Sequence, residues 1–162
     1  EQSTVQFLRT KGYDLFPHQR EGIQWMIARE LSDTPSGILA DEPGLGKTLQ
    51  VVGLCHACPV RRTLVVVPKS LLTQWVSILK HMFGKDSVLL YHRSQYGFDW
   101  CVPREYKYVV TTYSTFANNR MTLHENIELW DRLILDEGHL ISNKNNIPLV
   151  FFSKSGKSIY EF

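Results

Sequence analysis

The sequence predicts a three-layer α/β fold, with helices packed against a mostly parallel central sheet. Short apolar runs recur about every 30 residues with helical patterns between most of them, which is the arrangement of βαβ units. Most of these runs are continuous rather than alternating, as in strands that are buried on both faces of a parallel sheet. The five predicted strands are Gly37–Ala40, Leu64–Val67, Val88–Tyr91, Tyr108–Thr111 and Leu133–Leu135.

The segments between these strands predict amphipathic helices. One helix begins at Pro17, a residue that suits the first helical position because its missing N–H needs no partner there. The clearest helix spans Ser70–Phe83, where apolar residues form two neighbouring stripes at helical spacing. One of these stripes consists of Leu71, Trp75, Ile78 and Met82. We interpret its large side chains, including Trp75, as core residues.

Composition limits the class of protein. The 162 residues suit one globular domain, with 43% hydrophobic and 21% charged residues. No apolar stretch approaches the ~18 residues of a membrane span, so we expect no membrane partner. The formal net charge of +2 permits contact with nucleic acid without requiring it. Cys55 and Cys58 form a C-x-x-C pattern, but no second ligand pair follows, which favours reduced thiols over a metal or redox site.

A phosphate-binding loop is predicted directly after the first strand. The strand Gly37–Ala40 leads into a loop that opens a helix, and the loop reads Asp41-Glu42-Pro43-Gly44-Leu45-Gly46-Lys47-Thr48. The two glycines let backbone N–H groups approach phosphate oxygens, and the helix N-terminus favours the same anion. Lys47 would place its charge on the β and γ phosphates, and Thr48 would coordinate Mg²⁺. An incidental glycine-rich turn is the alternative interpretation.

An acidic pair follows the last predicted strand. Leu133–Leu135 leads into Asp136-Glu137-Gly138-His139. Asp136 is predicted to hold Mg²⁺, and Glu137 is predicted to orient and polarise the attacking water. A polar strand end followed by a turn is the alternative, which the phosphate loop upstream disfavours.

With these two motifs, the chain resembles the Swi/Snf family of DNA-dependent ATPases, within helicase superfamily 2. Asp41 departs from the general phosphate-loop pattern but is the residue that this family places there, whereas Pro43 stands where Met is commoner. The resemblance implies a RecA-like ATP-binding lobe over residues 15–146. It leaves an N-terminal extension over 1–14 and a tail over 147–162 that does not match the family.

The resemblance also implies roles for residues outside the two motifs. Gln19, in the segment Leu15–Gly22, would recognise adenine beside the cofactor-binding loop of Asp41, Glu42, Pro43, Gly44, Leu45, Gly46, Lys47 and Thr48. His139 would couple hydrolysis to movement. Residues in two further loops would contact the DNA backbone, and their cation and hydroxyls suit phosphate oxygens. These residues are Lys69, Ser70, Thr111 and Thr112. Capping or turn formation is the alternative role for each of them.

The activity implied by the resemblance is ATP hydrolysis coupled to movement on double-stranded DNA, free or in nucleosomes, in chromatin remodelling or repair. ATP and Mg²⁺ are the expected cofactors, and Lys47, Asp136 and Glu137 are the expected catalytic residues. The tail and the initial Glu1 lead us to expect a fragment or truncated product that lacks the second RecA-like lobe. Such a chain would bind Mg-ATP but hydrolyse it poorly, because the arginines across the cleft are absent.

Two alternatives remain open from the sequence. The chain could be a truncated, non-catalytic product that acts only by binding, or another superfamily 2 helicase that acts on RNA. A nuclear location follows from the resemblance, and a viral origin fits equally well.

Overall fold

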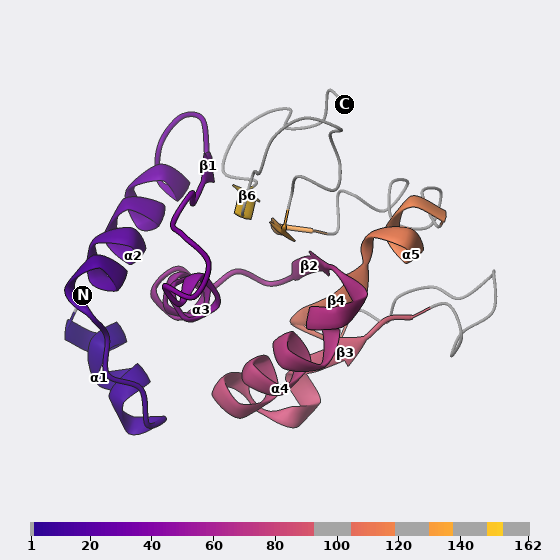
Figure 1. Ribbon diagram of the computed structural model, residues 1–162, viewed down its shortest axis with the longest axis horizontal. Helices are drawn as coiled ribbons and strands as arrows, with labels where there is room; N and C mark the ends of the chain where they lie inside the picture. The colour runs from indigo at the N-terminus through magenta and orange to yellow at the C-terminus, as the bar shows by residue number, and fades with distance from the viewer. Residues whose placement is uncertain (1, 93–104, 119–129, 138–148, 154–162) are drawn as a thin grey trace.

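The computed structural model describes residues 2–92, 105–118, 130–137 and 149–153, which form one six-stranded sheet with helices around it (Figure 1). The strand order is β1-β6-β5-β2-β4-β3. The strands are β1 (Ser36–Ile38), β2 (Thr63–Val67), β3 (Val88–Leu90), β4 (Tyr108–Thr112), β5 (Arg132–Asp136) and β6 (Leu149–Ser153). The helices are α1 (Gln2–Thr10), α2 (Pro17–Glu30), α3 (Lys47–Ala57), α4 (Leu72–Phe83) and α5 (Tyr113–Asn118), with short 3₁₀ turns η1 (Lys69–Leu71) and η2 (Lys85–Ser87).

The predicted mostly parallel sheet is confirmed. β3, β4, β2 and β5 are parallel neighbours, and each coincides with a predicted run to within one or two residues. β6 was not predicted. It lies in the 147–162 tail and pairs antiparallel with both β1 and β5. The domain boundaries at residues 15 and 146 stay a prediction.

The two faces of the sheet carry different helices. Val65, Val67 and Ile134 point into a core shared with α1, α2, α3 and α4. Their sequence neighbours on the opposite face pack with Tyr113 and Phe116 of α5. Because successive side chains of a strand alternate between faces, continuous apolar strands require cover on both sides, and three layers result.

α1 belongs to the packed structure, although the sequence predicts an extension over residues 1–14. Leu8 is fully buried, and the Phe7 ring stacks on the His56 ring of α3 with 4.0 Å between ring centroids. Thr4 Oγ1 lies 3.1 Å from His56 Nδ1. α1 therefore supports α3, the helix that begins at the predicted phosphate loop.

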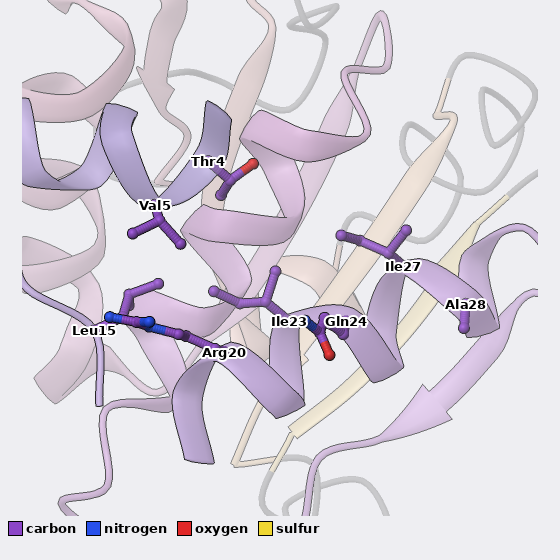
Figure 2. A pocket seen from close by; sticks show the side chains of 8 residues that line it. All are labelled: Thr4, Val5, Leu15, Arg20, Ile23, Gln24, Ile27 and Ala28. Carbon is purple, nitrogen blue, oxygen red and sulfur yellow. The ribbon is translucent and has the colours of Figure 1, made fainter. Parts of the chain in front are cut away.

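A hollow of about 280 Å³ lies between α1 and α2 (Figure 2). Its lining is mostly apolar and consists of Thr4, Val5, Leu15, Arg20, Ile23, Gln24, Ile27 and Ala28. None of these residues belongs to the predicted phosphate loop or acidic pair, whereas Leu15 and Arg20 belong to the predicted adenine segment. No helix among the described residues has both the length and the apolarity to cross a membrane.

A buried ion pair ties the start of β5 to two helices. Arg132 donates from Nε to Glu30 Oε2 at 3.1 Å, and its Nη2 donates to Glu30 Oε1 and to the carbonyl of Cys58. Arg132 is 1% exposed and Glu30 is 4% exposed. Arg132 Nη1 also lies 3.5 Å from Cys55 Sγ, and burial raises the pKa of the Cys55 thiol.

These contacts favour the reduced-thiol interpretation of the C-x-x-C pattern. A raised pKa keeps Cys55 protonated and unreactive, because the thiolate is the nucleophile and metal ligand. No group of three or more potential metal ligands of the His, Cys, Asp and Glu types occurs in the described part of the chain.

Replacing Arg132 with Met should lower the free energy of unfolding by about 3–5 kcal/mol, because the buried Glu30 side chain then loses its ion pair with Arg132. Urea denaturation measures this loss. Arg9→Met is the control, since the Arg9–Asp14 pair is exposed at both ends and should cost no more than about 1 kcal/mol. Equal losses in the two variants would contradict a structural role for the buried pair.

Candidate nucleotide-binding site

The loop between β1 and α3 has the backbone of a phosphate cradle. Gly44 and Gly46 have φ angles of +87° and +79°, in the left-handed region that L side chains rarely adopt. Gly46 directly precedes Lys47, the first residue of α3, so the helix N-terminus opens where the sequence predicts. A Cβ atom added to Gly46 would lie 2.3 Å from Gln19 Nε2, which leaves no room for a side chain.

Lys47 is folded onto its own loop. Its Nζ donates to the Asp41 carbonyl at 2.7 Å and to the Glu42 carbonyl at 3.1 Å. The ammonium group thus donates hydrogen bonds to two loop carbonyls that lie beyond the end of β1. Two of the three N–H donors of the ammonium are used in this way, so a phosphate can accept the third directly and the others only by displacing the carbonyls.

Gln19 connects the predicted adenine segment to the phosphate loop. It is 5% exposed, and its Nε2 donates to the Leu45 carbonyl at 3.1 Å. Its Oε1 accepts from the Phe16 amide at 3.0 Å, at the start of α2. His18 Nε2 also lies 3.2 Å from the Leu45 carbonyl. The structure therefore brings the two segments together, while recognition of adenine by Gln19 stays a prediction.

Asp41 is held by a residue outside the sequence motifs. Gln50 Nε2 donates to Asp41 Oδ2 at 2.8 Å, and Gln50 is fully buried in α3. Gly22 of α2 makes space for it, because an added Cβ there would lie 1.8 Å from Gln50 Oε1. Asp41 stands where the general phosphate-loop pattern has glycine. Its hydrogen bond with Gln50 anchors the start of the loop to α3. An isolated glycine inside a helical pattern was the available signal for such a close approach.

The acidic pair lies at the end of β5. Asp136 is 6% exposed, and its Oδ1 accepts from the Glu137 amide at 3.0 Å. Its Oδ2 accepts from the Trp75 indole Nε1 at 2.6 Å. Burial raises the pKa of the Asp136 carboxyl, and the Trp75 hydrogen bond, together with the positive charge of Lys47, opposes that rise. The charge of Lys47 therefore acts on the Asp136 carboxyl, although the two residues are far apart in the sequence.

Glu137 has a φ angle of +54°, which is unusual for a residue with a side chain. Backbone strain of this kind concentrates at functional positions. Tyr113 OH donates to the Asp136 carbonyl at 2.6 Å and so holds the backbone just before this turn. Burial, followed by the charges of Asp136 and Glu137, raises the pKa of Tyr113, which keeps its hydroxyl protonated as a donor.

Trp75 has a second role besides the predicted one. It is fully buried in the core, as the helical stripe indicates, but its indole also binds the predicted metal carboxylate. Helical spacing shows which face of a helix is buried and does not show what the buried polar atom meets there. The contact was for that reason not visible in the sequence.

The four residues predicted to contact DNA lie in two different environments. Lys69 and Ser70 are exposed in η1, at the carboxyl end of β2. Thr111 and Thr112 are 0% and 2% exposed at the end of β4.

The Thr112 hydroxyl contacts Thr115 Oγ1 at 3.0 Å and Ser114 Oγ at 3.1 Å. It also accepts from the Thr115 amide at 3.3 Å. Thr112 thus caps the start of α5, which is the alternative role considered from the sequence. Thr111 and Thr112 are buried in this conformation, and contact of their hydroxyls with DNA stays a prediction. His139 lies outside the described residues.

The residues present fit a magnesium nucleotide. The Thr48 hydroxyl and the Asp136 carboxylate are oxygen donors of the kind that Mg²⁺ prefers, and Thr48 is half-buried in the first turn of α3. The glycines at positive φ leave the loop backbone free of side chains where phosphate would approach.

Residues 18–149 match the profile of the SNF2-related domain. This covers most of the chain, so the chain belongs to the SNF2-related family, a family of ATP-dependent, helicase-like ATPases. The resemblance that the two motifs predict is thereby confirmed.

Several curated relatives share this region. The chain is 37% identical over 151 residues to the SNF2 domain-containing protein ENL1 of Oryza sativa subsp. japonica, a match that covers 80% of this chain and 15% of that protein. It is 37% identical to Protein CHROMATIN REMODELING 24 of Arabidopsis thaliana, covering 81% of this chain and 14% of the relative. The chain is also 35% identical to a probable global transactivator of the Orgyia pseudotsugata multicapsid polyhedrosis virus, a match that covers 80% of this chain and 28% of that protein. The chain thus spans less than a third of the length of each of these relatives.

A solved structure shares the fold. It is described as the Sulfolobus solfataricus SWI2/SNF2 ATPase core in complex with dsDNA. The match has a TM-score of 0.55 and 27% sequence identity, and it covers 67% of this chain and 23% of the other.

Gly46→Ala should destabilise the protein more than Gly44→Ala does. Both substitutions place a side chain at positive φ, a cost of order 1–3 kcal/mol, but only Gly46→Ala also drives a Cβ against the Gln19 amide. Chemical denaturation of both variants measures the difference. Adding Gln19→Ala should restore part of the stability of Gly46→Ala and none of that of Gly44→Ala. An equal response in both backgrounds would contradict close packing between Gln19 and the loop.

Proposed function

We propose that this chain is the ATP-binding lobe of a DNA-dependent ATPase that moves along double-stranded DNA. One observation carries the proposal: a loop with two glycines at positive φ opens α3 at Lys47, and the positive charge of Lys47 acts on the buried carboxylate of Asp136. Lys47 is the first residue of α3, and Asp136 is the last residue of β5. A cation and a metal-binding carboxylate that converge on a glycine-rich helix N-terminus suit a magnesium–triphosphate.

Each residue of the site has a defined task in this proposal. The Lys47 ammonium leaves the loop carbonyls and binds the β and γ phosphates, while the loop amides and the α3 N-terminus bind the same group. Thr48 and Asp136 hold Mg²⁺, which when bound neutralises charge that develops on the phosphates. Glu137 orients the attacking water and polarises it. Gln19 recognises adenine from α2, where it already contacts the loop.

The DNA partner is the second part of the proposal. A solved structure with the same fold is described as a complex with dsDNA, and one relative is named for chromatin remodelling. Lys69 and Ser70, exposed at the carboxyl edge of the sheet, provide the cation and hydroxyl that phosphate oxygens bind. A second RecA-like lobe, with arginines facing the nucleotide, completes the motor in this proposal. The nucleus is the proposed location, and the match to a viral protein keeps a viral source compatible with it.

Lys47→Ala should weaken binding of a fluorescent ATP analogue in the presence of Mg²⁺ by about 10- to 100-fold. The physical reason is the loss of a charge-assisted contact with phosphate. Fluorescence titration of the purified chain gives the two dissociation constants. Lys85→Ala is the matched control, because Lys85 is an exposed lysine of η2 outside the site. Unchanged binding by Lys47→Ala would mean that the phosphate loop is misassigned.

Lys69→Ala should weaken binding of duplex DNA and reduce the salt dependence of binding by about one phosphate contact. Fluorescence anisotropy with a labelled duplex at several salt concentrations measures both effects. Lys85→Ala serves again as control, since it removes an exposed lysine near the opposite end of α4. Unlabelled duplex DNA should compete better than RNA of the same length. Stronger competition by RNA would favour an RNA helicase instead.

A further inference from the structure

Two aromatic side chains from different helices converge on one residue of the acidic pair. The Trp75 indole donates to the Asp136 carboxylate at 2.6 Å, and Tyr113 OH donates to the Asp136 carbonyl at 2.6 Å. Trp75 belongs to α4 and Tyr113 to α5, and these helices lie on opposite faces of the sheet. Asp136 is therefore held by its side chain from one face and by its backbone from the other.

Each helix begins at one of the loops predicted to contact DNA. Lys69 and Ser70 form the start of η1, which leads directly into α4, and Trp75 lies in the first turn of that helix. Tyr113 is the first residue of α5 and directly follows Thr112. Helices are rigid over one or two turns, so a displacement of either loop moves the attached aromatic donor with it.

We propose that Trp75 and Tyr113 are positioning residues that hold Asp136 for Mg²⁺ and pass displacements of the two DNA-side loops to it. The inference rests on the proposed function, and it assigns the regulation of that same site. DNA bound at the edge of the sheet would thereby change the geometry of the metal carboxylate without touching the nucleotide.

Ordinary core packing does not account for this arrangement. Two other aromatic polar groups in the same cores, Trp130 Nε1 and Tyr108 OH, are buried without a hydrogen-bond partner in the part of the chain that the structure describes. These two buried aromatic side chains therefore lack the kind of hydrogen bond that Trp75 and Tyr113 make. Both paired donors, in contrast, act on a single residue.

The contacts leave Asp136 able to bind a metal. Oδ2 accepts from Trp75, Oδ1 accepts from the Glu137 amide, and each oxygen keeps a further lone pair. Partners that orient a metal ligand in this way commonly change metal affinity by 10- to 100-fold when they are removed. The expected effect is therefore on the contribution of Mg²⁺ and not on the phosphate loop.

The first test compares nucleotide affinity with and without the metal. A fluorescent ADP analogue is titrated into the 162-residue chain in Mg²⁺ and in EDTA, and the ratio of the two affinities is the magnesium factor. Trp75→Phe should reduce this factor about 10-fold and leave the affinity in EDTA unchanged. Tyr113→Phe, which removes one oxygen atom, should reduce it in the same direction and keeps the test valid if Trp75→Phe does not fold.

Trp130→Phe and Tyr108→Phe are the matched controls, because each removes the same kind of polar atom from a buried aromatic side chain outside the site. Both should keep the magnesium factor of the original chain. If the original chain shows a magnesium factor and Trp75→Phe and Tyr113→Phe keep it, the inference is overturned while the proposed function stands. If the original chain does not bind the nucleotide, the proposed function fails and the inference fails with it.

The second test follows the Trp75 indole directly. In ¹⁵N-tryptophan-labelled protein, Trp75→Phe identifies the Nε1–H resonance of Trp75. Adding duplex DNA without nucleotide should shift this resonance, and the Trp130 resonance should stay in place because Trp130 precedes β5 at its opposite end. Lys69→Ala should diminish the DNA-induced shift.

Binding of DNA, measured by anisotropy, without a shift of the Trp75 resonance would overturn the transmission of displacements from the loops to Asp136. A chain that binds no DNA would overturn the transmission and the DNA part of the proposed function together, while the magnesium factor still tests the positioning of Asp136.

Discussion

The parallel pairing of β2 with its two neighbours is the constraint on which the candidate site depends. Val67 pairs with Thr112 of β4, and Val66 pairs with Leu135 of β5, so these three strands end at the same edge of the sheet. Residues that follow each strand must then lie near one another, however far apart they are in the sequence. Asp136 meets side chains from α4 and α5 for this reason.

The central strand β5 carries a charged residue at each end and apolar residues between them. Arg132 and Asp136 are 1% and 6% exposed, so both charges are largely removed from water. Such burial is costly unless each charge finds partners. Arg132 obtains a carboxylate, Glu30, which stabilises the junction of β5 with α2 and α3. Among the described residues, Asp136 accepts hydrogen bonds from neutral donors, and burial raises the pKa of its carboxyl despite these bonds and the charge of Lys47. A cation bound beside this carboxylate would compensate the remaining cost of its burial.

The phosphate loop is organised by contacts with its surroundings as well as by its glycines. Gln19 holds the Leu45 carbonyl, Gln50 holds the Asp41 carboxylate, and Lys47 closes the loop onto its own carbonyls. Two of these contacts come from outside the loop, so its shape depends on how α2 and α3 pack. That packing is close, as the lack of space for a Cβ atom at Gly22 shows.

The sequence by itself determined the four parallel strands and the family and located the glycine-containing loop and the acidic pair, because each is encoded in residues that are neighbours in the chain. Apolar runs, glycines before a lysine and carboxylates after a strand are local patterns with direct physical causes. Only the tertiary structure decided the packing of α1, the antiparallel β6, the capping role of Thr112 and the contact between Trp75 and Asp136. The last of these joins residues 61 positions apart, and the register of the sheet sets their distance. Hydrophobic periodicity places Trp75 in the core, but its polar partner there depends on which strands lie beneath α4, and that is a property of the assembled fold.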